Sequence, residues 1–201
     1  MEQTEKNTKT IDFIPMRIKI GEMLKTQEEV NKVIGEKLPR LPNGGDYILA
    51  FNIEFFEFIN EVGVWKWWKH SHVPNKERVL DELADCFAFF LSLINLSALS
   101  EEEEKDQELF KYSTSKRLQD IFESLTALEH ENEEMSTEMI LQNLITYVGT
   151  DNETEGVDTM TRMAIAIYIA TLVFPEITWE DIVSAYNKKS ETNINRQKEN
   201  Y

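Results

Sequence analysis

Apolar residues recur at the three- and four-residue spacing of an amphipathic helix along most of this chain. The spacing predicts helices over 16–38, 47–62, 75–96, 137–148 and 157–174, with one or two more between 101 and 129 and a last one from 178 through 186. Ser100 and Glu103 have the form of a capping box for the 101–129 stretch. Because no convincing two-residue alternation indicates a strand, the pattern predicts an all-α bundle of about six or seven helices.

The hydrophobicity of the segments also indicates how the chain is divided. Residues 1–12 are polar and predict a flexible N-terminal arm, whereas residues 13–201 are long enough for a single helical domain around one core. The stretch 157–174 is apolar nearly all round, which predicts a central buried helix. A loop before the second helix is predicted by Pro39, Pro42, Gly44 and Gly45.

Charge narrows the possible partners of the protein. The 201 residues carry a formal net charge of −16, which argues against nucleic acid as a partner because phosphate-backbone binding needs clustered cations. The same charge would attract divalent cations. The C-terminal segment, 186–201, reverses the sign locally through Lys188, Lys189, Arg196 and Lys198.

Cysteine usage and hydropathy indicate the cellular setting. Cys86 is the only cysteine, which fits a reducing compartment. The first residues have no apolar signal-peptide core, and no run reaches the roughly eighteen apolar residues of a membrane span. We therefore expect a cytoplasmic protein that is not inserted in a membrane.

Two pairs of acidic residues are the strongest candidates for chemistry. Glu54 and Glu57 lie three apart in one predicted helix, and Glu82 and Asp85 lie three apart in the next, so each pair projects from one helix face. If the two helices pack antiparallel, the four carboxylates converge within apolar surroundings, where Mg²⁺ or Mn²⁺ would relieve their repulsion. The alternative is two ordinary amphipathic helices with solvated acidic faces.

Several motifs resemble those of a known family. The two acidic pairs, the Trp-Lys-Trp-Trp-Lys turn of residues 65–69 and Phe89 are similar to segments of the dimeric, all-α dUTPases. Further similarity lies in the pair Gln27 and Asn31 and in a closing motif of Tyr186, Lys189, Asn193, Arg196, Gln197 and Tyr201. That family belongs to the all-α NTP pyrophosphatase superfamily, which includes MazG-like enzymes. The acidic pairs are shared by the superfamily, whereas the aromatic turn and closing motif are more particular to dUTPases.

The resemblance implies roles for the residues near the phosphates. Glu54, Glu57, Glu82 and Asp85 would hold two or more Mg²⁺ ions, with Mn²⁺ as a substitute. Either Glu54 or Glu57 would accept a proton from the attacking water. The phosphates would be bound by Lys189 and Arg196, with Lys66 placed to meet one of them.

The resemblance also implies roles near the nucleoside. Gln27 and Asn31 would read the uracil edge, Trp68 would stack on the base, and Asn193 and Tyr201 would add hydrogen bonds. Phe89 would lie against the deoxyribose, where an apolar face leaves no partner for a ribose hydroxyl. The family often has His immediately before this Phe, but the chain has Ala88, which leaves the contacts to the sugar less constrained.

Together these features predict a Mg²⁺-dependent hydrolase that converts dUTP to dUMP and pyrophosphate, with dUDP as a second substrate. The resemblance implies a homodimer whose site is built across both subunits or both halves of the chain. Two alternatives stay open at this point. One is a MazG-like pyrophosphatase acting on another base, such as dCTP, and the other is a helical interaction module without activity.

Overall fold

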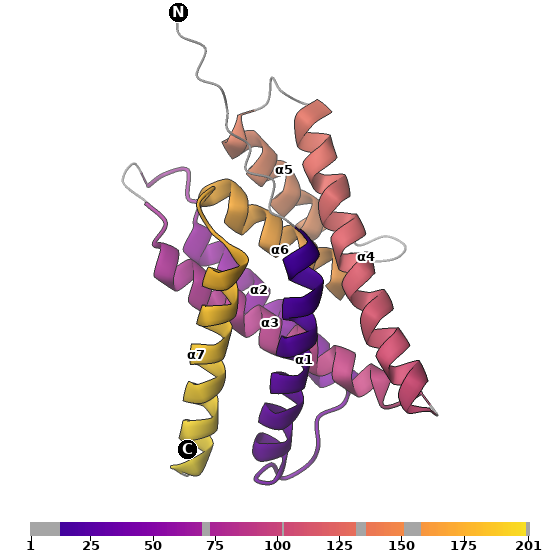
Figure 1. Ribbon diagram of the computed structural model, residues 1–201. Coiled ribbons are helices and arrows are strands. Elements are labelled where there is room, and N and C mark those ends of the chain that lie inside the picture. The colour runs from indigo at the N-terminus through magenta and orange to yellow at the C-terminus, as the bar shows by residue number, and fades with distance from the viewer. Residues whose placement is uncertain (1–12, 70–72, 102, 132–135, 151–157, 200–201) are drawn as a thin grey trace, which may run out of the picture.

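The computed structural model is all helical, as the spacing of apolar residues predicts. It describes residues 13–69, 73–101, 103–131, 136–150 and 158–199, so the predicted arm of residues 1–12 lies outside the described residues. Within those ranges it has no strand and seven helices (Figure 1): α1 Phe13–Gly35, α2 Gly44–Val62, α3 Lys76–Ala98, α4 Glu104–Glu131, α5 Thr137–Thr150, α6 Thr159–Val173 and α7 Trp179–Lys198.

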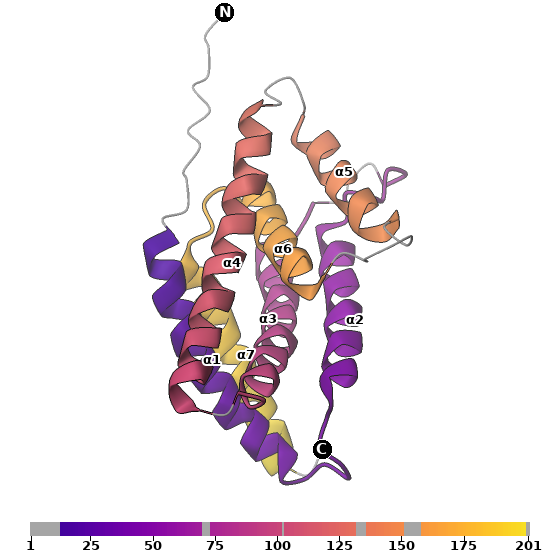
Figure 2. The same ribbon diagram turned by 90° about the vertical axis from the view of Figure 1, so that its right-hand side faces the viewer.

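Helix α3 lies at the centre of the bundle. It packs against α1, α2, α4, α6 and α7 (Figure 2). Because neighbours surround it on most sides, its apolar residues face several directions, and Leu83, Phe87 and Leu91 are fully buried. Its antiparallel neighbour α2 contributes Phe51, Phe55 and Phe58 to the same core.

The start of α2 differs from the sequence prediction. The helix begins at Gly44, so the two glycines expected in a loop form its first turn. Asn43 Oδ1 accepts from the Asp46 backbone N–H at 3.1 Å, and Asp46 Oδ2 accepts from the Asn43 backbone N–H at 2.8 Å. Arg40 donates to both Asp46 oxygens, and this contact lowers the pKa of the carboxyl. This capping box explains the earlier start.

Three other boundaries also differ. The predicted capping box at Ser100 is wrong, because the Ser100 hydroxyl donates to the Ser97 carbonyl at 2.6 Å and α4 begins only at Glu104. Helix α1 ends at Gly35 rather than at residue 38. Helix α7 continues well past residue 186 to Lys198, and basic residues in its last turn complement the helix dipole.

The prediction of a central buried helix is confirmed for α6. Residues 163–170 are buried all round, and α6 contacts α2, α3, α4 and α5. Asp158 caps its start by accepting from the Thr161 backbone N–H at 2.7 Å. None of the helices in the described ranges is both long and apolar enough to cross a membrane.

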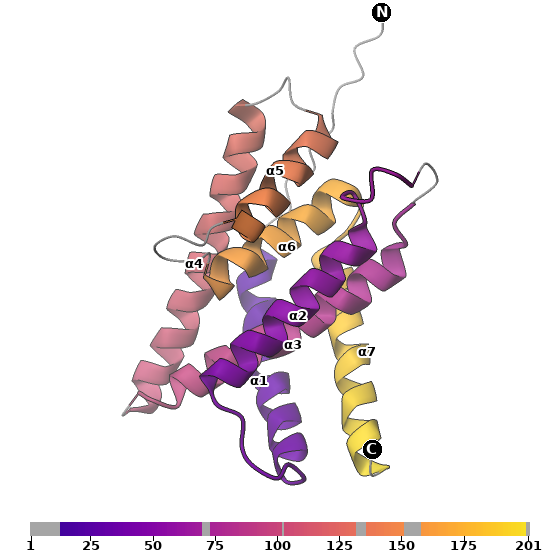
Figure 3. The same cartoon turned by 180° about the vertical axis from the view of Figure 1, so that it is seen from behind.

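One side of α2 has no helix over it among the described residues. Figure 3 shows this side facing the viewer, with α3 behind it. Four large apolar residues are exposed there, with Ile53 51% exposed, and we call them the outer stripe: Ile48, Leu49, Ile53 and Phe56. An apolar helix face of this kind is typical of an interface.

The position of α3 generates a test of the core. Leu91→Ala removes a fully buried side chain from the helix that most others contact, so we expect a loss of about 2–5 kcal/mol in the free energy of unfolding. Leu109→Ala, at a position 61% exposed, is the matched control and should change stability little. Denaturant unfolding of both variants measures the difference, and equal effects would contradict the central place of α3.

Candidate active site

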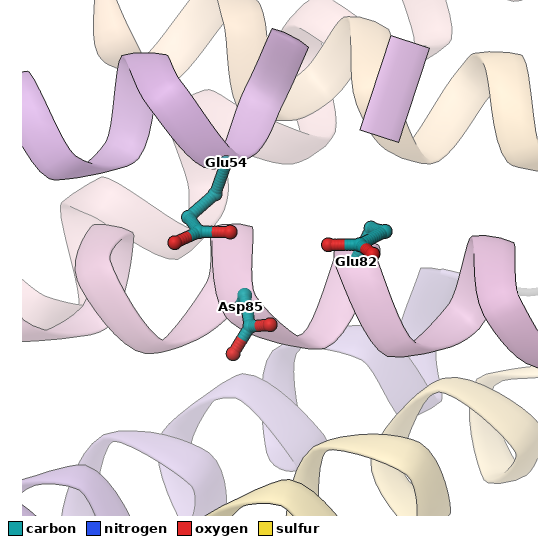
Figure 4. Close-up of side chains that lie close together, drawn as sticks. All are labelled: Glu54, Glu82 and Asp85. Carbon is teal, nitrogen blue, oxygen red and sulfur yellow. The ribbon is translucent and has the colours of Figure 1, made fainter. Parts of the chain in front are cut away.

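Three acidic side chains meet between α2 and α3. Glu54 extends from α2 toward Glu82 and Asp85 on α3 (Figure 4), and one carboxylate oxygen of each lies within 4.8 Å of the others. We call this group the carboxylate cluster. It contains three of the four residues predicted to bind metal. Glu57, one turn further along α2, is exposed and lies at the edge of the cluster.

The cluster is electrostatically unfavourable without a cation. Burial, followed by repulsion from Asp85, Glu57 and Glu82, raises the pKa of Glu54 from 4.5 to about 7. The pKa values of Glu82 and Asp85 are also raised, again mainly by burial. Carboxyl groups at this spacing therefore favour either protonation or a positive charge placed among them.

A lysine from the last helix supplies part of that charge. Lys189 Nζ lies 2.5 Å from Asp85 Oδ2 and 2.8 Å from Asp81 Oδ2. Burial alone would lower the pKa of Lys189, but the hydrogen bonds to the two aspartates outweigh it and the pKa is raised. The predicted phosphate-binding lysine therefore lies directly at the cluster.

Two neighbouring groups take no part in the cluster. Glu61, four residues past Glu57, accepts a hydrogen bond from Arg78 at 2.6 Å. Burial raises the pKa of the Cys86 thiol well above its usual value, so this cysteine is a packed and unreactive side chain.

The donor set of the cluster fits a hard divalent cation. All three groups offer carboxylate oxygens, which are the preferred ligands of Mg²⁺ and Mn²⁺. The partial burial of the three groups leaves room for further ligands from water or substrate, as Mg²⁺ usually keeps. The raised pKa values of the three groups also indicate a cation site, since a bound cation would stabilise the ionised carboxylates.

A cavity of about 500 Å³ adjoins the cluster, and Asp85 belongs to both. Four predicted substrate-binding residues line it, namely Gln27 and Asn31 from α1, Phe89 from α3 and Asn193 from α7. The structure thus brings together residues that are far apart in the sequence. Most of the remaining lining is apolar, which suits a flat organic ring more than a phosphate.

The amide groups in the cavity are held by hydrogen bonds. Gln27 is 3% exposed and donates through Nε2 to Asn31 Oδ1 at 2.9 Å. The Tyr186 hydroxyl lies 2.8 Å from Gln27 Oε1, and the Ser92 hydroxyl lies 2.9 Å from Asn31 Oδ1. Side chains fixed in this way can recognise a ligand without losing much conformational entropy.

Sequence reasoning missed other lining residues. Ser92 and Asn95 lie on the face of α3 that also carries Asp85 and Ala88, which the sequence had already singled out, and Tyr47 completes the wall from α2. The available signal was two polar residues, Ser92 and Asn95, on the apolar side of a strongly hydrophobic helix.

Other predicted residues do not reach the cavity in a single chain. Trp68 packs edge-on against Trp65 and Trp67 in the turn after α2, and Lys66 donates to the Asn60 carbonyl at 2.7 Å. Arg196 is exposed in the last turn of α7. Tyr201 lies outside the described residues.

Comparison with known proteins supports one of the three predicted functions. No curated protein matches the sequence. A family model for dUTPase matches residues 19–201, a range that includes the carboxylate cluster, the cavity and the closing motif. The match agrees with the all-helical architecture and favours dUTP over the alternative substrates and over a module without activity. The chain therefore belongs to the all-α dUTPase family and is a hydrolase, a dUTP diphosphatase.

Proposed function

We propose that the carboxylate cluster binds Mg²⁺, or Mn²⁺ in its place, for the hydrolysis of dUTP. The observation that carries this proposal is the convergence of three partly buried carboxylates within 4.8 Å. Glu57 at the edge of the cluster would supply the fourth ligand and allow two or more ions. Bound Mg²⁺ would neutralise these charges and polarise phosphate oxygens.

The phosphates would lie at the cluster and the base in the adjoining cavity. Asp85 supports this arrangement because it belongs to both. Lys189, Asn193 and Arg196 lie four and three residues apart on α7, so one helix face would run along the substrate. Lys189, which lies beside Asp85 and Asp81, would present its positive charge to the phosphates.

Glu54 and Glu57 are the candidates for activating water. Water would add to a phosphorus, its proton would pass to the carboxylate, and the bond between the α- and β-phosphates would break to give dUMP and pyrophosphate. Burial and acidic neighbours raise the pKa of Glu54 to about 7 in the metal-free protein; bound Mg²⁺ would lower it again, so the carboxylate would be ionised and able to accept the proton at neutral pH. Hydrolysis of dUDP by the same groups would give dUMP and phosphate.

The sugar would lie beside Phe89 and Ala88. Both residues line the cavity on the same face of α3, one turn from Asp85. An apolar surface at this point offers no partner to a ribose 2′-hydroxyl, so it would favour deoxynucleotides.

We propose a homodimer that completes the site. The outer stripe on α2 is apolar and exposed, and a second copy packed antiparallel across Ile53 would cover it with the same stripe. A twofold axis near Ile53 would place the partner's aromatic turn beside the start of α2, where Tyr47 lines the cavity. That arrangement would bring a partner tryptophan and lysine to the substrate, which a single chain does not do.

Removal of cluster carboxylates tests the metal site. Glu54→Gln and Asp85→Asn should each lower kcat for dUTP by at least about 100-fold, because each removes a ligand or the base. Release of dUMP and pyrophosphate with Mg²⁺, and again with the metal chelated, measures the effect. Glu61→Gln, whose side chain is paired with Arg78 and is not a member of the cluster, is the control. Full activity of Asp85→Asn without Mg²⁺ would contradict the proposal.

The raised pKa of Glu54 predicts how stability depends on pH. The folded metal-free protein retains the Glu54 proton up to a pKa of about 7, whereas the unfolded chain releases it near 4.5. The free energy of unfolding should therefore fall as pH rises from about 5 to 7 and level off above that. Asp46 and Asp181 have lowered pKa values, so their contributions change only below this window.

Denaturant unfolding of the metal-free protein at several pH values measures this trend. Glu54→Gln should reduce the slope and leave the part due to Glu82 and Asp85, whereas an exposed glutamate changed in the same way, Glu29→Gln, should not change it. Mg²⁺ added at pH 8 should restore stability to the native protein but less to Glu54→Gln. A free energy of unfolding that rises steadily from pH 5 to 7 would show that the pKa of Glu54 is not raised in the folded protein.

A charge in the outer stripe tests the dimer. Ile53→Asp places a carboxylate at the centre of the proposed interface and should give monomers with at least about tenfold lower activity on dUTP. Leu109→Asp puts the same charge at an exposed apolar residue outside the outer stripe and should change neither property. Light scattering after size-exclusion chromatography measures the mass. A fully active monomer would disprove the shared site.

A further inference from the structure

Four polar side chains from α7, α1 and α3 form a hydrogen-bonded row beside the cavity, and we call them the polar row: Tyr186, Gln27, Asn31 and Ser92. Both ends of the row meet backbone carbonyls, because the Tyr186 hydroxyl lies 3.1 Å from the Met23 oxygen and the Ser92 hydroxyl lies 2.7 Å from the Ala88 oxygen. Within the row, neighbouring polar atoms are 2.8 or 2.9 Å apart. The row is largely buried, so a contact that lacks a proton is costly.

The number of protons in the row restricts the orientation of its two amides. With Gln27 Nε2 donating to Asn31 Oδ1, the single Ser92 proton has two acceptors, Asn31 and a backbone carbonyl, and can serve only one of them. The single Tyr186 proton has the same conflict between Gln27 Oε1 and its own carbonyl. Two contacts would then bring acceptors together without a proton.

A half-turn of both amides removes this conflict. It exchanges nitrogen and oxygen at nearly the same positions. Each hydroxyl can then donate to its carbonyl, the Tyr186 oxygen accepts from Gln27, and Ser92 accepts from Asn31. The second N–H of Asn31 meets Gln27 Oε1, so each of the five contacts holds one proton. This orientation is favoured because no contact lacks a donor.

We infer that Ser92 is a positioning residue for base recognition, because it holds Asn31 with its carbonyl oxygen toward the cavity. Asn31 lines the cavity, and the end of its amide that faces neither Gln27 nor Ser92 is not buried and has no partner among the described residues. A fixed acceptor at this point attracts the N3–H of uracil and repels the unprotonated N3 of cytosine. The inference rests on the proposed placement of the base in the cavity.

Hydrogen exchange of the Asn31 side-chain amide tests the orientation in the native protein. Both of its protons are bound within the row in the inferred orientation, so they should exchange at least about tenfold more slowly than those of the exposed Asn187. NMR measures the two rates, and Asn31→Asp identifies the signals by removing them. Exchange as fast as that of Asn187 would overturn the inference, because the nitrogen would then face the cavity.

The ratio of kcat/KM for dUTP to that for dCTP tests the role of Ser92. Ser92→Ala leaves one N–H of Asn31 without an acceptor, so the reversed amide should become populated and the ratio should fall by about tenfold. Ser97→Ala is the matched control, because its hydroxyl also donates to a carbonyl within α3, at 2.9 Å, but the residue does not line the cavity. An unchanged ratio in Ser92→Ala would mean that its hydroxyl only packs within the bundle.

Addition of dUMP separates this inference from the proposed function. A base in the cavity should shift the amide signals of Asn31 in the native protein. If they do not shift, the base binds elsewhere, and the proposed placement is overturned together with the role of Ser92. If they shift but Ser92→Ala keeps the native ratio, only the role of Ser92 is overturned.

Discussion

Repulsion among three carboxylates at a helix interface is the constraint on which the rest of this structure depends. Glu54, Glu82 and Asp85 are held close together and partly buried. Their raised pKa values show that it costs free energy to keep all three carboxylates ionised. The apolar contact between α2 and α3 offsets it, with Phe51 of α2 and Phe90 of α3 at a centroid distance of 6.5 Å. The surrounding helices then hold α2 and α3 together, so that the carboxylates cannot separate.

Helices α1 and α7 connect the cluster to the cavity. They lie side by side (Figure 1), and the Tyr186 hydroxyl of α7 contacts both the Met23 carbonyl and Gln27 of α1. The same α7 carries Lys189 to the carboxylates and Asn193 to the cavity. A contact deep in the bundle therefore determines the positions of Lys189 at the cluster and Asn193 at the cavity.

The sequence predicted this architecture well, because helical periodicity and acidic pairs are local signals. The spacing of Glu82 and Asp85 was enough to place both on one face of a helix that packs against Glu54. Ends of helices were harder to predict: the capping box at Asn43 depends on a side-chain hydrogen bond that outweighed two glycines. The contact of Asn95 was not predictable, since its hydrogen bond depends on which α1 carbonyl lies opposite. Trp68 and Lys66 were predicted to bind substrate, but a single chain leaves them in the turn.

Helix α3 carries Asp85 of the carboxylate cluster and Asn95 of the adjoining cavity along one continuous helix. Each residue of an α-helix turns the chain by about 100° and advances it by about 1.5 Å. A single insertion between Asp85 and Asn95 would therefore rotate the cavity residues away from the face that holds the carboxylates. Substitutions can change either end of the site separately, but an insertion or deletion within this stretch would disrupt both ends. We therefore expect members of the family to differ here by substitution, with the number of residues between the two positions unchanged.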